Sequence, residues 1–365
     1  MDKNKRLTVW LPVIIAASIA LGIFLGNHYL SISQGKKRSY SSGNKINAIL
    51  DIIDEQYVDT VSMSKLVEST IPKIFSELDP HSVYIPAEDA SVVNEELEGS
   101  FSGIGVSFNM QTDTILVISV ISGGPAEKAG LLPFDRIISI NDSIFSGKKK
   151  NQGEIMKTLR GAKNSTVKLG VQRGNSPELL YFDVTRGDVP VNSVDVSYEA
   201  AKGIGYIKVS KFARNTYNEF ITAIAKLKQA GCTSFVIDLR GNTGGYMDAA
   251  INMINEFMPE GRLIVYTEGK SFPRSDVYAN GTGTCKDAPI VVLTDEISAS
   301  ASEIFSGAIQ DNDRGTIIGR RTYGKGLVQT QMSLSDGSEM RLTIARYYTP
   351  SGRCIQKKYE MGNTD

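Results

Sequence analysis

Two short segments of this 365-residue chain combine small residues with side chains that can act on a substrate. In the glycine turn, residues 238–245 (Asp-Leu-Arg-Gly-Asn-Thr-Gly-Gly), the glycines allow backbone N–H groups to face a bound oxygen. In the serine segment, residues 297–303, three serines alternate with alanines at the expected start of a helix. Farther along the chain, Lys325 stands between two glycines. A serine that attacks a substrate with the help of a base is the chemistry that this set offers.

The identity of that base is the first question, because histidine is nearly absent. The chain contains two histidines, His28 and His81. His81 lies in residues 78–82 (Leu-Asp-Pro-His-Ser), where proline breaks a helical pattern, and a turn residue bonded to backbone is favoured there over a catalytic histidine. A lysine kept neutral by burial is the alternative, provided that its pKa falls well below the ordinary value of about 10.4.

Spacing alone identifies neither partner of such a pair. A serine at a helix start is most often only an N-cap. A lysine in a glycine-rich loop is most often solvated. The residues by themselves therefore leave open which serine reacts and whether Lys325 reaches it.

The composition excludes several classes of function. The 40 Lys and Arg residues balance the 40 Asp and Glu residues, so no overall positive field would attract nucleic acid. Cys232, Cys285 and Cys354 are far apart in the sequence, and with two histidines they cannot form a zinc-type cluster at the usual spacings. We therefore expect no metal and no cofactor. Whether Cys285 pairs with Cys354 stays open.

Residues 1–30 predict a membrane anchor or a signal segment. Lys3, Lys5 and Arg6 precede residues 9–25, which carry no charge and suit either a short membrane-spanning helix or a signal peptide. An uncleaved anchor is favoured because no clean Ala-x-Ala site follows. The polar linker of residues 31–44 argues against a buried core helix. The rest of the protein would then be attached to the cell membrane and lie outside the cytoplasm, in the periplasm or an equivalent extracytoplasmic space.

Three pieces follow the linker. Apolar residues at helical spacing predict an N-terminal helical segment over residues 45–97. Residues 98–187 are rich in expected strands, and residues 188–365 alternate strands with helices, which predicts βαβ units and a mainly parallel sheet. Sheets of this kind bind ligands outside the carboxyl ends of their strands, where the glycine turn and the serine segment are expected.

The strand-rich piece resembles a PDZ domain. Gly103-Ile104-Gly105-Val106 stands in the position of the carboxylate loop, where paired glycines let backbone N–H groups converge on a peptide carboxylate. Residues 124–131 (Gly-Pro-Ala-Glu-Lys-Ala-Gly-Leu) are the second hallmark. Phe134 departs from the pattern, because these domains usually carry glycine before the following aspartate. The resemblance implies binding of peptide C-termini by main-chain hydrogen bonds.

The chain as a whole, over residues 44–353, resembles the carboxyl-terminal processing peptidases, the tail-specific serine proteases. Five motifs occur in the family's order: residues 78–82, the PDZ-like module, residues 238–245, residues 298–303 and residues 322–326. The resemblance implies that Ser300 is the nucleophile, that Lys325 is the general base, and that Gln329 orients this lysine. It also implies an α/β core of the ClpP/crotonase type with an inserted PDZ domain and an N-terminal helical segment.

The same resemblance supplies an oxyanion hole. The backbone N–H of Ala301 matches one donor, and a glycine of the Gly244–Gly245 pair matches the other, with Gly245 preferred. The function implied is a serine endopeptidase that cleaves proteins after recognising their free C-termini, with the PDZ domain binding substrate or gating the site. Two rival classes are a catalytically silent PDZ adaptor and an acyl-CoA enzyme on a crotonase fold. Assembly as a homo-oligomer, or with an adaptor protein, is left open.

Overall fold

The computed structural model describes residues 16–23, 42–111, 114–144 and 152–359. The chain divides into two compact units, Met1–Thr70 and Ile71–Asp365. The first contains helix α2 (Ser42–Gln56) and the start of helix α3 (Met63–Ser76). Of the uncharged run at residues 9–25, only residues 16–23 are described, as a helix. None of the helices in the described ranges combines the length and the apolar character that crossing a bilayer requires.

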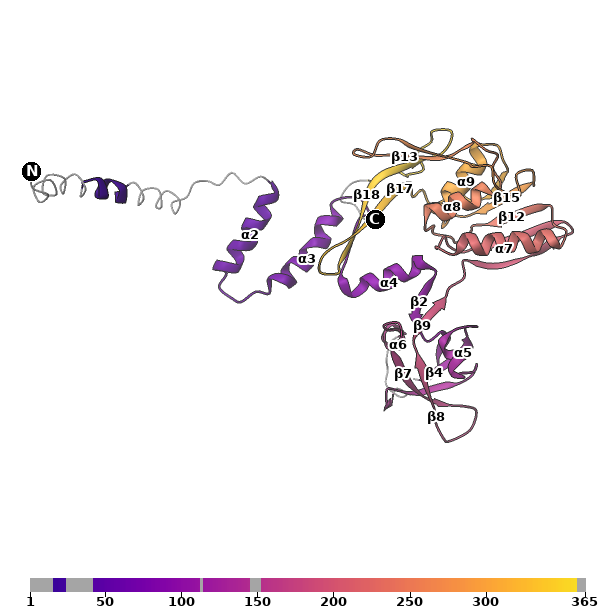
Figure 1. The fold of residues 1–365 in the computed structure, drawn as a ribbon, viewed down its shortest axis with the longest axis horizontal. Coiled ribbons are helices and arrows are strands. Elements are labelled where there is room, and N and C mark those ends of the chain that lie inside the picture. The colour runs from indigo at the N-terminus through magenta and orange to yellow at the C-terminus, as the bar shows by residue number, and fades with distance from the viewer. Residues whose placement is uncertain (1–15, 24–41, 112–113, 145–151, 360–365) are drawn as a thin grey trace, which may run out of the picture. The chain divides into compact units, whose positions relative to one another are not determined.

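The larger unit is built around a five-stranded sheet in the order β10-β11-β12-β15-β16. Figure 1 labels β12 and β15 of this sheet. The last four strands are parallel and β10 is an antiparallel edge, which confirms the predicted α/β class with a mainly parallel sheet. The strands are Val194–Ala201, Ile204–Val209, Ser234–Asp238, Ile290–Thr294 and Thr316–Gly319. The helices of this core are α7 (Thr216–Gln229), α8 (Met247–Asn255) and α9 (Ala301–Asp311).

The apolar faces of these elements make one continuous core. Its largest fully buried side chains are phenylalanines, and Phe257 meets Phe220, Phe235 and Phe305 edge to face, with ring centroids 6.2, 6.2 and 6.5 Å away. Offset and edge-to-face rings pack more favourably than face-to-face sandwiches. The strand ends that carry the glycine turn and the serine segment therefore stand on a dry, closely packed base.

A second, antiparallel sheet contains strands from both ends of the larger unit. Its order is β1-β18-β13-β14, and β17 also pairs with β18, over Glu339–Arg346. The bounds are Val83–Ile85, Glu339–Tyr348, Leu263–Glu268, Ser275–Tyr278 and, for β17, Leu327–Ser333. Strand β1 lies inside the segment that the sequence predicts as helical, and it is followed by helix α4 (Ala87–Glu98). Residues 83–85 thus belong to a sheet with the C-terminal strands.

The strand-rich piece is a separate small sheet with its own core. Its strands are β3 (Val106–Gln111), β4 (Thr114–Val120), β5 (Arg136–Ile140), β6 (Ser143–Ile144), β7 (Thr166–Gln172) and β8 (Leu180–Thr185). Helices α5 (Pro125–Ala129) and α6 (Gln152–Leu159) accompany them. The chain enters and leaves through paired strands β2 (Ser100–Gly103) and β9 (Gly187–Pro190). An insertion whose ends are adjacent in this way leaves the flanking fold continuous.

Candidate active site

The glycine turn and the serine segment lie together because the strands before them are neighbours. β12 ends at Asp238 and β15 at Thr294, and these parallel strands pair with Asp238 opposite Leu293. Two hydrogen bonds join the segments that follow: Ser298 Oγ donates to Leu239 O at 2.8 Å, and Ala299 N–H donates to Asn242 O at 3.0 Å. Ser298, fully buried, is therefore a structural serine.

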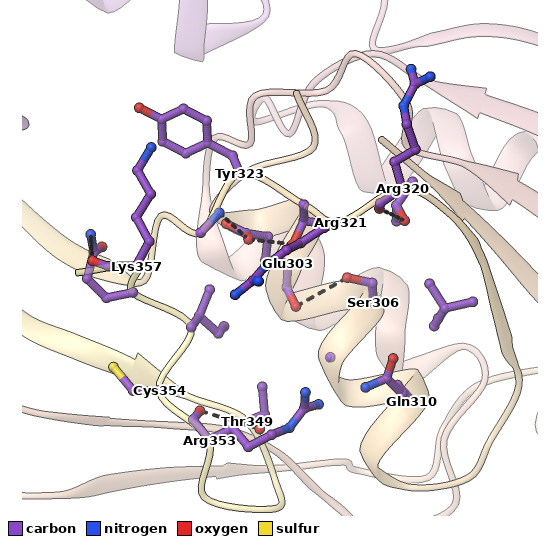
Figure 2. A pocket seen from close by; sticks show the side chains of 17 residues that line it. Glu303, Ser306, Gln310, Arg320, Arg321, Tyr323, Thr349, Arg353, Cys354 and Lys357 are labelled. Carbon is purple, nitrogen blue, oxygen red and sulfur yellow. Dashed lines mark hydrogen bonds between the residues drawn. The ribbon is translucent and has the colours of Figure 1, made fainter. Parts of the chain in front are cut away.

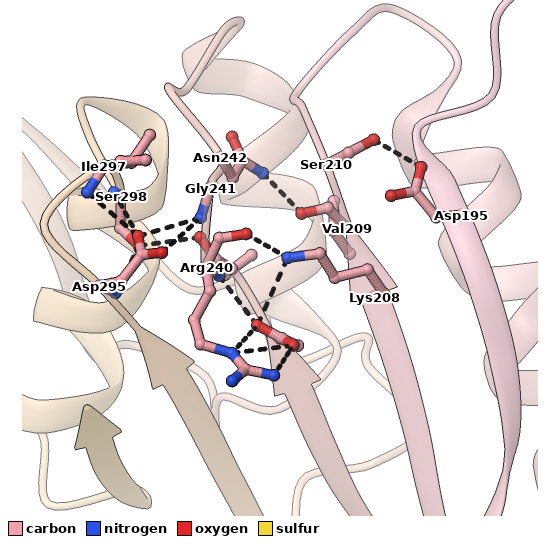
Figure 3. Close-up of polar contacts among 12 residues, drawn as sticks. Asp195, Lys208, Val209, Ser210, Arg240, Gly241, Asn242, Asp295, Ile297 and Ser298 are labelled. Atoms are coloured by element: carbon pink, nitrogen blue, oxygen red, sulfur yellow. Dashed lines mark hydrogen bonds and ion pairs between the residues drawn. The ribbon is translucent and has the colours of Figure 1, made fainter. Parts of the chain in front are cut away.

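Charged groups fix the glycine turn at its beginning (Figure 3). Asp238 is 1% exposed, and its carboxylate accepts hydrogen bonds from Arg240 Nη2 at 2.6 Å and from the Tyr206 hydroxyl at 2.6 Å. Burial by itself would raise the pKa of Asp238, but the bonds from Arg240 and Tyr206 bring it down to about 2. Lys208 Nζ lies 3.5 Å from the same carboxylate and donates to Arg240 O. The buried charge is fully paired.

A second carboxylate, Asp295, joins the two segments across the strand ends. Its oxygens accept the Gly241 N–H at 3.0 Å, and Oδ1 accepts the Ser298 N–H at 3.0 Å (Figure 3). Desolvation by itself would raise the pKa of Asp295. The hydrogen bonds that its carboxylate accepts from Gly241, Ile297 and Ser298 outweigh this effect, so the pKa is lowered. Asp295 stays ionised over the neutral range and holds the Gly241 backbone beside the serine segment.

Ser300 is the N-cap of α9, at a strained turn. Its backbone has φ 54° and ψ −112°, a region in which non-glycine residues cost about 1–3 kcal/mol and which is often found at functional sites. The residue is partly exposed, whereas the serines on either side, Ser298 and Ser302, are fully buried. Of the three serines in the segment, Ser300 is thus the one that a substrate can reach.

The carboxylate of Glu303, in the first turn of α9, connects Ser300 to the lysine loop, residues 322–326. Figure 2 shows Glu303 together with Tyr323 of this loop. Glu303 is 4% exposed, and its Oε2 accepts the backbone N–H groups of Ser300 and Lys325, each at 2.8 Å. Its Oε1 accepts the Gly324 N–H and the Thr322 hydroxyl, each at 2.7 Å. Four donors fill the lone-pair positions of an ionised carboxylate. The Ser300 and Lys325 backbones are therefore held close together through one oxygen.

The role of Glu303 was not predicted from the sequence, although a signal for it was present. Serine followed three residues later by glutamate is the capping-box pattern, in which the glutamate accepts the N–H of the N-cap residue. The local bond to Ser300 was thus readable. The bonds to Gly324 and Lys325 were not, because they come from a loop that lies beyond another strand.

Lys325 is partly buried and has an altered acidity. Desolvation is the main cause that lowers its pKa, and Arg341 lowers it further, while Asp79 acts in the opposite direction. Among the described residues, no hydrogen bond joins Lys325 Nζ to Ser300 Oγ. The structure thus brings the two backbones together, and a Ser–Lys dyad through the side chains stays a prediction.

Gln329 lies on β17, beyond the lysine loop. Its Nε2 donates to the backbone carbonyl oxygen of His81, not to Lys325. The His81 N–H donates in turn to Asp79 Oδ1 at 3.0 Å, as expected of a turn residue. The pKa of the His81 imidazole is lowered by burial first and by the charge of Lys325 second, so this ring is neutral near pH 7.

The two oxyanion-hole candidates differ in whether their N–H groups are available. Gly244 N–H donates to Asn242 Oδ1 at 2.8 Å, whereas the N–H groups of Gly245 and Ala301 have no hydrogen-bond partner within the described ranges. Gly244 instead packs on the serine: a Cβ at Gly244 would lie 2.8 Å from Ser300 Cβ and 3.1 Å from Ala301 N. The geometry therefore favours Gly245 with Ala301 as the pair of donors.

The predicted carboxylate loop, residues 103–106, also presents backbone donors. Neither Ile104 N–H nor Gly105 N–H has a partner in the described part of the chain, and Gly105 adopts φ 78°, which glycine reaches without strain. Beside the loop is a cavity of about 160 Å³. Its side chains are mostly apolar: Phe101, Ile104, Val106, Phe108, Met156, Leu159 and Arg160. Phe134 takes the positive φ (70°) that glycine would adopt in its place.

Metal ligands do not gather anywhere in the described ranges. No group of three or more His, Cys, Asp or Glu side chains in them has the arrangement that a metal ion requires. Cys232, Cys285 and Cys354 are free thiols, so Cys285 and Cys354 do not pair.

The fold and this site together define a serine hydrolase with a peptide-binding module. Peptidase family S41 matches residues 203–362, and the PDZ domain family matches residues 102–195. The carboxy-terminal processing protease CtpB of Bacillus subtilis (strain 168) is 35% identical over 318 residues, which cover 86% of this chain and 66% of that protein. A probable CtpA-like serine protease of Staphylococcus aureus (strain N315) is 33% identical, over 98% of this chain and 72% of that protein.

The chain therefore belongs to the carboxyl-terminal processing peptidases of family S41, which are serine-type peptidases with a PDZ domain. It spans about two thirds of the length of these relatives. Among solved structures, the photosystem II D1 C-terminal processing protease is 27% identical and superimposes with a TM-score of 0.48 over 87% of this chain and 91% of that one. The ClpP/crotonase likeness of the core stays a prediction.

Proposed function

We propose that this chain is an endopeptidase that hydrolyses proteins recognised by their free C-termini, with Ser300 as nucleophile and Lys325 as general base. The observation that carries this proposal is the Glu303 carboxylate, which accepts both the Ser300 and the Lys325 backbone N–H groups. A strained, partly exposed serine, a lysine of lowered pKa and two unused N–H donors surround that carboxylate. This combination supports acyl transfer more directly than any binding role.

In the reaction, neutral Lys325 Nζ takes the Ser300 Oγ proton as the oxygen attacks a peptide carbonyl. The oxyanion receives hydrogen bonds from Gly245 N–H and Ala301 N–H, and loss of one such donor typically costs about 10²–10³ in rate. Protonated Lys325 then gives its proton to the leaving amine, and water hydrolyses the acyl-enzyme by the same route. For the first step, Lys325 Nζ must move within hydrogen-bond distance of Ser300 Oγ. Such a movement is common, because catalytic hydrogen bonds often tighten only when substrate binds.

The lowered pKa of Lys325 sets the pH dependence. A base works in its unprotonated form, so the rate should rise with pH through the pKa of Lys325, below the ordinary lysine value of about 10.4. His81 should not contribute a second titration near neutral pH, because burial and Lys325 lower the pKa of its ring, and because Gln329 contacts its backbone carbonyl and not the ring.

The direct test is hydrolysis of an unfolded protein by the full-length chain in detergent. We expect Ser300→Ala and Lys325→Ala to abolish cleavage, and His81→Ala, which keeps the backbone carbonyl, to remain active. Fluorophosphonate labelling that disappears in Ser300→Ala distinguishes the enzyme from a silent PDZ adaptor. The assignment is wrong if folded His81→Ala is inactive while Lys325→Ala is not.

The carboxylate loop supports recognition of substrate C-termini. Ile104 N–H and Gly105 N–H are available to a carboxylate, and the apolar cavity beside them can hold the last side chain. Amidation removes the charge of a C-terminus, so an amidated substrate should be cleaved with a higher KM than the free acid. Equal KM values for the two forms would count against this part of the proposal.

A short connection supports gating of the site by the PDZ domain. Glu98 ends α4, immediately before β2 and the carboxylate loop. Its carboxylate accepts the Tyr246 hydroxyl at 3.1 Å and pairs with Arg214 at 2.7 Å, and Tyr246 adjoins Gly245. A short C-terminal peptide added in trans should therefore change the cleavage rate of a substrate that lacks a free C-terminus. Glu98→Gln should weaken that response, and an unchanged response would remove Glu98 from the connection.

Membrane attachment is the fourth part of the proposal. Its support is the sequence: residues 9–25 carry no charge, and three basic residues precede them. In cell fractionation we expect the full-length chain in the membrane fraction, with residues after the linker accessible to added protease from outside the cytoplasm. Recovery of an N-terminally trimmed chain in the soluble extracytoplasmic fraction would instead indicate a cleaved signal.

A further inference from the structure

The turn at residues 79–82, called here the Asp79 turn, has no role in the mechanism above, yet it adjoins the residues that do. It connects α3 to β1. Gln329 donates to the His81 carbonyl oxygen of this turn. The His81 ring lies 6.4 Å, centroid to centroid, from the ring of Tyr323, which belongs to the lysine loop. The turn therefore contacts both the residue thought to orient Lys325 and the loop that carries it.

One carboxylate folds this turn. Asp79 Oδ1 accepts the N–H groups of His81 and Ser82, both at 3.0 Å, and Oδ2 accepts the Ser82 hydroxyl at 2.5 Å. Aspartate often folds a turn in this way, through bonds to backbone groups two or three residues later. Ser82 is 4% exposed, so the bonds that it makes are shielded from water. The position of the His81 carbonyl thus depends on Asp79.

The same two side chains fasten the turn to the sheet beside Gln329. Thr343 of β18 donates its hydroxyl to Asp79 Oδ1 at 3.1 Å and its N–H to Ser82 Oγ at 3.0 Å. Thr343 is also the residue of β18 that pairs with Gln329 of β17. The turn is therefore attached at the point of the β17–β18 hairpin where Gln329 stands.

We propose that Asp79 is a positioning residue of the peptidase: it folds the turn whose His81 carbonyl holds the Gln329 amide, and it places a negative charge near Lys325. The proposal rests on the proposed function for the roles of Lys325 and Gln329. Residues 78–82 then do more than connect a helix to a strand: they help to position Gln329 and Lys325.

The charges around Lys325 fix the sign of the second effect. Arg341 of β18 lowers the pKa of Lys325 and Asp79 raises it. His81 of the turn is kept neutral by burial, by Lys325 and by Lys357. Glu303 contacts only the backbone of Lys325. Removing the charge of Asp79 should therefore lower the pKa of Lys325 further, so that the base becomes available at lower pH.

Two substitutions separate the two effects. Asn in place of Asp79 keeps an oxygen acceptor for the His81 N–H, the Ser82 N–H and the Thr343 hydroxyl, and its amide can donate to Ser82 Oγ. Asp79→Asn should thus retain most of the maximal kcat while its pH profile moves to lower pH. Asp79→Ala removes the fold of the turn, and its kcat should fall about 10²-fold, as displacements near 1 Å can cause, with KM little changed.

Asp336 offers a matched control in the turn of the same hairpin. Its Oδ1 accepts the Ser338 N–H at 3.0 Å and the Ser338 hydroxyl at 2.6 Å, which is the same local pattern. Asp336→Ala should leave kcat and the pH profile unchanged. An equal fall of kcat in Asp336→Ala and Asp79→Ala would mean that both act only through hairpin stability, and would overturn the proposal.

A readout without turnover separates this proposal from the proposed function. In Ser300→Ala protein with ¹³C-labelled lysine, the Lys325 signal, assigned by its loss in Lys325→Arg, should titrate at lower pH when Asp79→Asn is added. No change in that titration, or full kcat in folded Asp79→Ala, would overturn the proposal. If Asp79→Ala does not fold, Thr343→Val, which removes one bond to Asp79, replaces it and should lower kcat by a smaller factor.

Discussion

The predicted carboxylate loop and the candidate active site both present unpaired backbone N–H groups at or beside glycines, but the segments that carry these groups are held in place differently. At the predicted carboxylate loop, the N–H groups of Ile104 and Gly105 have no hydrogen-bond partner among the described residues. At the candidate active site, Asp238, Asp295 and Glu303 fasten the segments that carry the proposed oxyanion donors and reacting groups.

The difference follows from what each site must accomplish. A peptide C-terminus brings its own charge and can adjust to two donors on one strand edge. Acyl transfer requires groups from three separate segments to meet within a fraction of an ångström, before any substrate charge helps to hold them. Carboxylates that each accept several hydrogen bonds provide that order, because a hydrogen bond to a charged acceptor is stronger than one between neutral groups.

The largest effect that this comparison predicts is at Gly245. A Cβ there would lie 2.1 Å from Phe212 O and 2.7 Å from Phe212 C, so backbone must move and the Gly245 N–H leaves its place. We expect Gly245→Ala to lower kcat by about 10²–10³, the usual cost of an oxyanion donor. Steady-state hydrolysis of an unfolded protein measures it, and near-normal kcat would remove Gly245 from the oxyanion hole.

Glu303→Gln should have the next largest effect. Glutamine keeps one acceptor oxygen and replaces the other with an NH₂ group that can only donate. Either the N–H groups of Ser300 and Lys325, or the Gly324 N–H and the Thr322 hydroxyl, then lose their acceptor. Each buried donor left unpaired costs about 1–3 kcal/mol, and both stability and kcat should fall. Glu296→Gln is the control, because Glu296 is an exposed carboxylate paired with Arg320 at 2.5 Å. Urea unfolding and kcat that are the same for both variants would contradict the role given to Glu303.

Gly105→Ala should have a smaller effect, confined to recognition. The nearest atoms to a Cβ there lie at 3.4 Å, which is ordinary contact, so the cost is that of a left-handed backbone for alanine, about 1–2 kcal/mol. We expect KM for substrates with free C-termini to rise several-fold, with fluorophosphonate labelling of Ser300 unchanged. Slower labelling would show that the substitution also disturbs the surroundings of Ser300, so that its effect is not confined to recognition.

Lys325→Met should raise stability, because the lowered pKa of Lys325 means that burial of its charge opposes folding. The folded state binds fewer protons than the unfolded state between the lowered pKa and the ordinary value of about 10.4. The excess stability of the variant should therefore be fully present at pH below the lowered pKa and vanish above about 10.4. Urea unfolding of both proteins over this pH range measures it, and a constant difference would refute the shift.

Local patterns predicted the main sheet and the strand ends. Alternating strands and helices after residue 188 indicated parallel pairing, and the glycine turn and serine segment lie at adjacent carboxyl ends as expected. The spacing of Gly103 and Gly105 predicted a backbone nest for a carboxylate, and binding of a carboxylate there stays a prediction. These features depend on residues close together in the sequence.

Features that depend on contacts between residues far apart in the sequence could not be predicted. Strand β1 pairs with β18 from the other end of the unit, and three residues carry too little periodicity to reveal a strand. The contact between Gln329 and the His81 carbonyl follows from that pairing, because β18 also carries Thr343, which holds the turn. The sequence could predict Glu303 as a capping residue. Its hydrogen bonds to the lysine loop could be recognised only in the folded structure.

The most direct test of the central claim is the rate at which a fluorophosphonate labels Ser300 as a function of pH, followed by intact mass. In the native chain the rate should rise along a single titration below the ordinary lysine value, and His81→Ala should behave alike. In Lys325→Ala labelling should be slow and lack that rise. Labelling of Lys325→Ala with the native rate and pH dependence would contradict the claim that this lysine activates Ser300.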